Sequence, residues 1–195
     1  DGDRFSTKTG TALPTFAAQS VQAADLNRDG FPEVIFGSQI DSVEGTITTS
    51  ELHIYWGEPN RGLGAGSDDT LPANATLTPH ITDLDGDGHL DIVAPGYAID
   101  DDDYTPDSYI YWGSSTGPSV GDFTALQTDN AVHATSGDLD EDGIPELVFG
   151  SYYNGGSDFD TVSRVYAGTD DGYSDDDVQL LTTLGVWAEP IIVGD

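Results

Sequence analysis

The chain has 195 residues, 36% of them hydrophobic and 10% aromatic, with 24 glycines and 10 prolines, which favours short strands and turns over disorder. Its 36 acidic against 5 basic residues give a formal net charge of −31, which excludes nucleic acid and anionic lipid as partners because like charges repel. It has no cysteine and no apolar run long enough to span a membrane, which excludes disulfides and membrane insertion.

An acidic motif of nine residues occurs three times in the same register. It reads DLNRDGFPE from Asp25, DLDGDGHLD from Asp83 and DLDEDGIPE from Asp138, so successive motifs begin 58 and 55 residues apart. Each motif runs on into an apolar stretch, as expected where a turn leads into a buried strand. Self-similarity at such a period indicates a repeat architecture.

In chain order, we expect one repeat array over residues 1–195. Residues 1–24 read as the end of a preceding blade, and they are followed by repeats at 25–82, 83–137 and 138–194. The third repeat ends at the start of a further loop at Asp195. The chain thus begins and ends inside a blade, and open strand edges there would invite contacts with other chains.

Each repeat is predicted to contain four short strands. Strands end in an aromatic-glycine signature at 53–57, 109–113 and 165–168. A shorter strand follows each of them, near 70–77, 123–128 and 177–183. Four strands in a repeat of this length match a propeller blade. We therefore predict an all-β fold of about three blades, each of four antiparallel strands, as a partial propeller or one completed by other copies.

The spacing of the acidic motif suits calcium, which binds six to eight oxygen atoms. Side chains at positions 1, 3 and 5 can turn toward one centre, and glycine at position 6 permits the sharp turn that this requires. The carbonyl of position 7 then faces the ion, and an acid at position 9 completes the coordination shell. We predict three calcium ions, one per loop. The candidate ligands are Asp25, Asn27, Asp29, Phe31 and Glu33; Asp83, Asp85, Asp87, His89 and Asp91; and Asp138, Asp140, Asp142, Ile144 and Glu146.

Other metal loops fit less well. An EF-hand needs an acid at position 12 and flanking helices, whereas position 12 is Phe36, Ala94 or Phe149 inside an apolar strand. Magnesium prefers fewer protein ligands and more water. Because Asn27 lacks a charge, the first site is expected to bind more weakly than the others.

The motif, followed by an apolar strand that ends in Phe-Gly, resembles the FG-GAP repeat of integrin α-chain propellers and their microbial relatives. VIFG at 34–37 and LVFG at 147–150 carry that signature, and IVAPG at 92–96 departs from it. The resemblance implies four-stranded blades, calcium in the loop between the first two strands and an extracellular setting. It does not imply integrin function, because the same blade serves adhesion, scaffolding and secreted enzymes.

We expect most of the remaining candidate functional residues to have structural roles. His53, His80 and His133 lack the spacing of a zinc site. The pairs Tyr55-Trp56 and Tyr111-Trp112 could form a sugar-binding platform, but strand alternation puts one member of each pair in the core. The acidic run at 100–103 is a solvated loop or a weak cation site, and Asn74 begins a lone glycosylation sequon.

Two classes of function compete. The chain contains no catalytic motif, so we expect a non-enzymatic extracellular module with an adhesive or structural role, including a filament- or surface-forming one, whose partners are protein or glycan ligands or other copies of itself. The alternative is the propeller of a secreted enzyme such as a polysaccharide lyase, which needs a basic cluster to hold an acidic sugar. The five basic residues are scattered: Arg4, Lys8, Arg28, Arg61 and Arg164.

Overall fold

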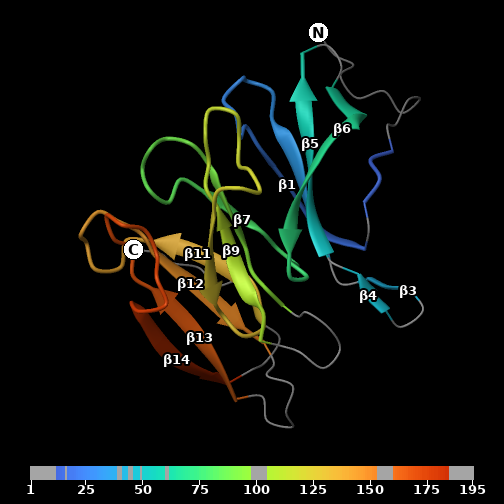
Figure 1. The fold of residues 1–195 in the computed structure, drawn as a ribbon. Coiled ribbons are helices and arrows are strands. Elements are labelled where there is room, and N and C mark those ends of the chain that lie inside the picture. The colour runs from blue at the N-terminus through green and yellow to red at the C-terminus, as the bar shows by residue number, and fades with distance from the viewer. Residues whose placement is uncertain are drawn as a thin grey trace.

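Three open, four-stranded β-sheets and one two-stranded hairpin make up the described part of the fold (Figure 1). The computed structural model describes residues 12–15, 17–38, 41–43, 46–48, 50–59, 62–97, 105–152 and 160–184. These residues hold fourteen strands and no helix, so they contain no helix that could cross a bilayer. Each of the three larger sheets has four antiparallel strands, and none closes into a barrel. The all-β prediction is confirmed, and the sheets have the form expected of partial propeller-like blades.

The sheets, called blades 1, 2 and 3 below, follow one another along the chain. Blade 1 consists of β1 (Ala18–Ala24), β2 (Glu33–Ser38), β5 (Ser50–Glu58) and β6 (Gly62–Ala73). Blade 2 consists of β7 (His80–Thr82), β8 (Asp91–Ala94), β9 (Asp107–Tyr111) and β10 (Phe123–Gln127). Blade 3 consists of β11 (Ala131–Gly137), β12 (Glu146–Ser151), β13 (Asp160–Tyr166) and β14 (Val178–Leu184). In each blade the sheet order is the chain order, so every acidic motif joins the first two strands of one blade.

The segment between β2 and β5 contains a hairpin that the sequence did not predict. β3 (Asp41–Val43) pairs with β4 (Thr46–Thr48) as a separate hairpin between β2 and β5. The acidic run at 100–103 lies outside the described residues.

The three blades share one register, which makes their residues directly comparable. On the second and third strands, the facing pairs are Val34 with Tyr55, Ile92 with Tyr111, and Leu147 with Tyr166. Side chains alternate between the two faces of a strand. Each blade therefore presents one apolar face to the blade before it and another to the blade after it.

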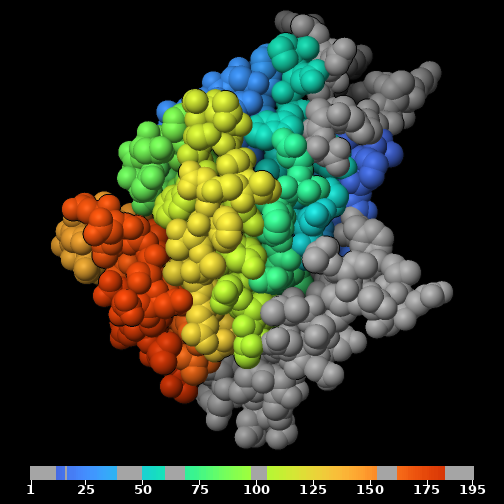
Figure 2. All heavy atoms as spheres, viewed as in Figure 1, coloured from blue at the N-terminus to red at the C-terminus, as the bar shows by residue number. Residues whose placement is uncertain are grey.

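The core lies between neighbouring blades. One cluster joins residues of blade 1, including Leu26 and Ile54, to Tyr111 of blade 2. A second cluster joins residues of blade 2, including Leu84, to Phe149 of blade 3. Burying a side chain of this size contributes about 1.5–3 kcal/mol, so blade-to-blade packing contributes strongly to stability. Figure 2 shows blade 2, in green and yellow, between blade 1 in blue and teal and blade 3 in orange and red.

A tyrosine near the end of each third strand ties its blade to an earlier segment. The hydroxyls of Tyr111 and Tyr166 donate to the carbonyls of Pro72 and Gln127 in the preceding blade. Tyr55 donates in the same way to the carbonyl of Pro14. The partners lie 39 to 41 residues earlier in the sequence, so this hydrogen bond repeats with the blades.

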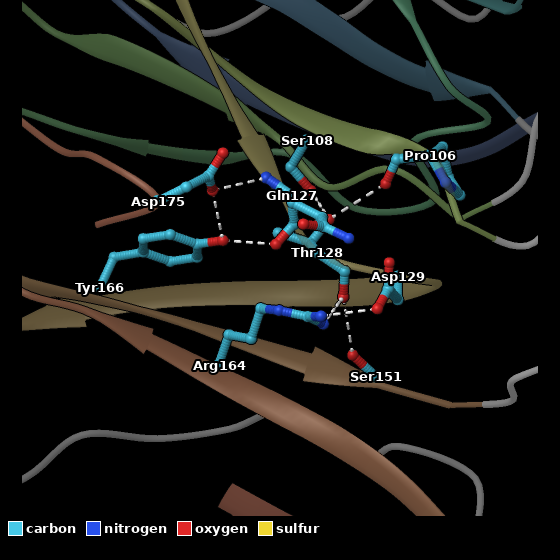
Figure 3. Close-up of polar contacts among 9 residues, drawn as sticks. All are labelled: Pro106, Ser108, Gln127, Thr128, Asp129, Ser151, Arg164, Tyr166 and Asp175. Atoms are coloured by element: carbon cyan, nitrogen blue, oxygen red, sulfur yellow. Dashed lines mark hydrogen bonds and ion pairs between the residues drawn. The ribbon is translucent and has the colours of Figure 1, made fainter. Parts of the chain in front are cut away.

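Polar side chains reinforce the junction between blades 2 and 3 (Figure 3). Arg164 of β13 donates to the Thr128 carbonyl at 2.7 Å and forms an ion pair with Asp129 at 2.5 Å. A carboxylate oxygen of Asp175 accepts the Gln127 backbone N–H at 2.9 Å. Arg164 is thus engaged in holding two blades together.

Candidate metal centres

The three acidic motifs form loops of the same shape at the same place in each blade. Loop 1 (residues 25–33) joins β1 to β2, loop 2 (83–91) joins β7 to β8, and loop 3 (138–146) joins β11 to β12. The last residue of each loop is also the first residue of the second strand. Position numbers 1 to 9 below count along each loop.

The carboxylates at positions 1 and 5 fix the backbone of the loop. In loop 2, one oxygen of Asp83 accepts the Gly88 N–H at 2.9 Å, and Asp87 accepts the His89 N–H at 2.7 Å. The same two bonds occur in loop 1 and loop 3, at 2.8–3.0 Å. Short polar side chains commonly stabilise turns in this way. The sequence therefore dictates the curl of the loop through local hydrogen bonds.

Each loop contains two residues with left-handed backbone. Position 6 is Gly30, Gly88 or Gly143, with φ between 89° and 95°, a region in which glycine avoids the steric cost of a side chain. Position 4 is also left-handed, with φ of 59° at Arg28, 72° at Gly86 and 64° at Glu141. The sequence predicted the first requirement but not the second, because only loop 2 has a glycine, Gly86, at position 4.

The acid at position 9 lies beneath the loop and is almost completely buried. In loop 2, Asp91 accepts the Leu84 N–H at 2.7 Å with one oxygen and the Gly113 N–H at 2.7 Å with the other. Glu33 holds the corresponding groups of Leu26 and Gly57, and Glu146 accepts the Leu139 N–H at 2.6 Å. In loops 1 and 2 this carboxylate thus connects the start of the loop to the end of the third strand.

The glycine of the aromatic-glycine signature is required by the same arrangement. A Cβ atom at Gly57, Gly113 or Gly168 would approach a carbonyl oxygen near the end of the loop to 2.5–2.6 Å, which is too close for any side chain. The recurrence of this glycine at the strand ends was a signal of the close approach, but sequence alone did not reveal its partner.

Carboxylates converge in loops 2 and 3. Asp83, Asp85 and Asp91 each place a ligand atom within 4.8 Å of the others, and Asp138, Asp140 and Glu146 do the same. These two acidic groups could hold a metal ion. Loop 1 has the same hydrogen-bonded frame, with Asn27 at position 3. Positions 5 and 7 contribute the turn hydrogen bonds described above.

Two carboxylate oxygens at position 1 support this interpretation. Asp25 and Asp83 each keep one oxygen, Oδ1, that is buried and has no hydrogen-bond partner in the structure. A buried acceptor without a partner is costly, and a cation held between the converging side chains would remove that cost. The donor set, made of hard oxygen atoms, fits a hard divalent cation.

Burial and crowding act on the acid at position 9. Burial, together with the nearby charges of Asp85 and Asp83, raises the pKa of the Asp91 carboxyl to about 6, although hydrogen bonds from two backbone N–H groups act in the opposite direction. Burial also raises the pKa of Glu33 above its usual value. Carboxylates in such close array repel one another, and a bound divalent cation relieves this repulsion.

The aromatic pairs and His80 prove to be packed or hydrogen-bonded. Tyr55 and Tyr111 are buried, as alternation predicted, whereas the indole N–H groups of Trp56 and Trp112 donate to Asp69 and Thr124. His80 Nε2 lies 3.0 Å from the Ser136 hydroxyl, between the strands that lead into loops 2 and 3. The amide nitrogen of the sequon residue Asn74 donates to the Asp107 carbonyl at 2.9 Å.

No protein-family model matches the chain, and no curated protein matches it either. The assignment of a function therefore rests on the geometry of the loops.

Proposed function

We propose that this chain is a non-enzymatic calcium-binding β-propeller repeat module of the cell exterior, with an adhesive or structural role. The observation that carries the proposal is the repeated loop: one hydrogen-bonded frame, built three times, with carboxylates converging in loops 2 and 3. A cation in each loop would fix the connection between the first two strands of every blade. The ions would then stiffen the array on which a ligand surface is displayed.

Calcium is favoured over other cations by the donor set. The side chains at positions 1, 3 and 9 supply only oxygen atoms, and both oxygens of a carboxylate can bind one large ion at 2.3–2.6 Å. Magnesium demands a smaller octahedral shell and retains water. Millimolar calcium outside cells suits sites of modest affinity, and such sites are filled only in that setting. The resemblance to FG-GAP repeats agrees with this assignment.

The surface hollows support a role other than acting on acidic sugars. One hollow of about 390 Å³ lies between blades 2 and 3 and is lined by residues that include Asp85, Asp170 and Asp171. A second, of about 540 Å³, is lined by Asp140, Asp176 and Asp177 among others. Neither lining, within the described residues, contains a lysine or arginine. An anionic substrate would be repelled from both.

Calcium titration of chelator-treated protein tests the proposal. We expect three ions to bind per chain, with loop 1 weakest, and the melting temperature to rise, since a ligand at 100 times its Kd stabilises the fold by about 2.7 kcal/mol per site. Asp85→Ala should remove one ion. The matched control, Asp122→Ala, removes an exposed acid outside the loops and should leave three. Absence of calcium uptake by calorimetry would contradict the proposal.

A further inference from the structure

Each junction between blades buries the same positions of the earlier blade. The leucine at loop position 2 is buried by the following blade, with exposed fractions of 0% for Leu26 and 1% for Leu84. On the fourth strand, Leu71 and Leu126 occupy equivalent positions, opposite Leu52 and Ser108, and are 2% and 1% exposed. We call this set of positions the following face of a blade.

Blade 3 presents the same face to solvent. Leu139, at loop position 2, is 50% exposed, and Leu181, equivalent to Leu126 by its pairing with Ser163, is 39% exposed. Val165 is half-buried, where its counterpart Ile110 is completely buried. Within the part of the chain that the structure describes, nothing covers these three side chains to the extent seen at the other junctions.

The following face of blade 3 is also hollow. Trp112 packs against the core between blades 2 and 3, and its ring lies near Gly172 in a turn of blade 3. The equivalent residue in blade 3 is Ala167, which lines the 540 Å³ hollow together with Leu139 and Val165. This hollow is large enough to accept side chains of a docking partner.

The complementary face is exposed at the other end of the array. In blade 3, Phe149 of the second strand is completely buried against blade 2, and Ala134 packs on the same cluster. Their counterparts in blade 1 are Phe36, which is half-buried, and Val21, which is 60% exposed. Blade 1 therefore carries an incompletely covered preceding face, of the kind that packs on a following face elsewhere in the chain.

A short segment partly covers this preceding face. The carbonyl of Pro14 accepts the Tyr55 hydroxyl, as the carbonyl of Pro72 accepts that of Tyr111. Leu13 occupies the place that Leu71 has in the next junction, but Leu13 is only half-buried. The segment 12–15 makes the polar contact without completing the apolar one.

We propose that two copies of this chain associate head to tail, with blade 3 of one copy packing on blade 1 of the next. The contact continues the junctions already present within the chain, because the chain carries both halves of one further junction at opposite ends of its array (Figure 1). In this arrangement the Thr182 carbonyl of one copy accepts the Tyr55 hydroxyl of the next copy, in place of the Pro14 carbonyl. Thr182 occupies the position that Pro72 and Gln127 have in the earlier blades. Such a heterologous contact forms rings or filaments, and it does not depend on the metal.

Sedimentation of the 195-residue chain over a wide concentration range tests the inference. The measurement is made in about 1 M monovalent salt, where repulsion between acidic surfaces reaches only about 3 Å, and both with calcium and with chelator. We expect the mass to rise with concentration above 20.6 kDa. A mass that stays at the monomer value throughout would overturn the proposal, whatever the calcium titration shows.

Two single-face variants identify the surfaces. Leu181→Asp on blade 3 and Val21→Asp on blade 1 change exposed side chains, and each is expected to weaken association at least tenfold, since about 1.4 kcal/mol corresponds to that factor. Mixed together, they should form one heterodimer and nothing larger, because each retains the face that the other lacks. The control Val120→Asp changes a side chain that is 58% exposed outside both faces and should associate normally. Self-association of Val21→Asp at wild-type strength would contradict head-to-tail packing.

Discussion

The carboxylates of an acidic loop fall into two groups that form hydrogen bonds to different parts of the fold. Those at positions 1, 3 and 5, called the rim here, hold N–H groups of the loop itself; Asp87, for example, accepts from His89. The carboxylate at position 9, called the floor, is buried and holds the loop to a distant strand, as Asp91 does with Leu84 and Gly113. The sequence motif presents all of them as equal ligands. In the structure, the floor carboxylate forms hydrogen bonds that hold the fold together even without an ion. The rim, by contrast, has exposed carboxylates that are available to bind an ion.

The largest predicted effect is at the floor. Asp91→Ala leaves the N–H groups of Leu84 and Gly113 without their acceptor, and each hydrogen bond to a charged group is worth about 1.5–3 kcal/mol. We expect a loss of about 3 kcal/mol in the free energy of unfolding, measured by urea titration, both with calcium and with chelator. A loss confined to the calcium-loaded protein would show that the floor acts only as a ligand.

The rim gives the opposite pattern. Asp85→Ala removes a carboxylate from a crowded group and one exposed hydrogen bond, to the Asp87 N–H at 3.0 Å. In chelator we expect a change of less than about 1 kcal/mol, because relief of repulsion offsets the lost bond. In saturating calcium the variant should be less stable than wild type by about 2–3 kcal/mol, the contribution of one filled site. Equal losses in both media would erase the distinction between rim and floor.

The strand that leads into loop 2 offers a metal-independent source of pH dependence. Burial lowers the pKa of the His80 imidazole below its ordinary value, so the unfolded chain binds this proton more readily than the folded one. The stability is complete above about pH 6.5, the unfolded value, and falls as the pH drops from there toward the lower folded pKa. The difference in unfolding free energy between wild type and His80→Gln, measured in chelator, should follow this course. A difference that is constant across this range would refute it.

Sequence reasoning reached the fold because the signals were local and repeated. The motif register placed the loops, and the apolar strands around Phe36 and Phe149 placed the sheets. It could not assign the two roles of the carboxylates, because the partner of Asp91 is Gly113, 22 residues away. Nor could it identify the contact of Tyr166 with Gln127 across a blade junction, since such a pairing exists only once the blades are packed.

The smallest predicted effect tests the backbone of the rim. Glu141 at position 4 is left-handed, with φ of 64°, and loop 2 has Gly86 in the same conformation at 72°. A left-handed residue with a side chain costs about 1–2 kcal/mol, and the greater unfolded-state entropy of glycine returns about 0.5–1 kcal/mol. Glu141→Gly should therefore stabilise the protein by about 0.5 kcal/mol in a urea titration.

Glu141→Gln keeps the strain and removes the charge, so it separates the backbone effect from relief of repulsion. The reciprocal change Gly86→Ala meets no atom within 4 Å, and by the same balance of strain against unfolded-state entropy it should cost about 0.5 kcal/mol. If Gly86→Ala were neutral, position 4 would not be strained and the gain in loop 3 would need another cause.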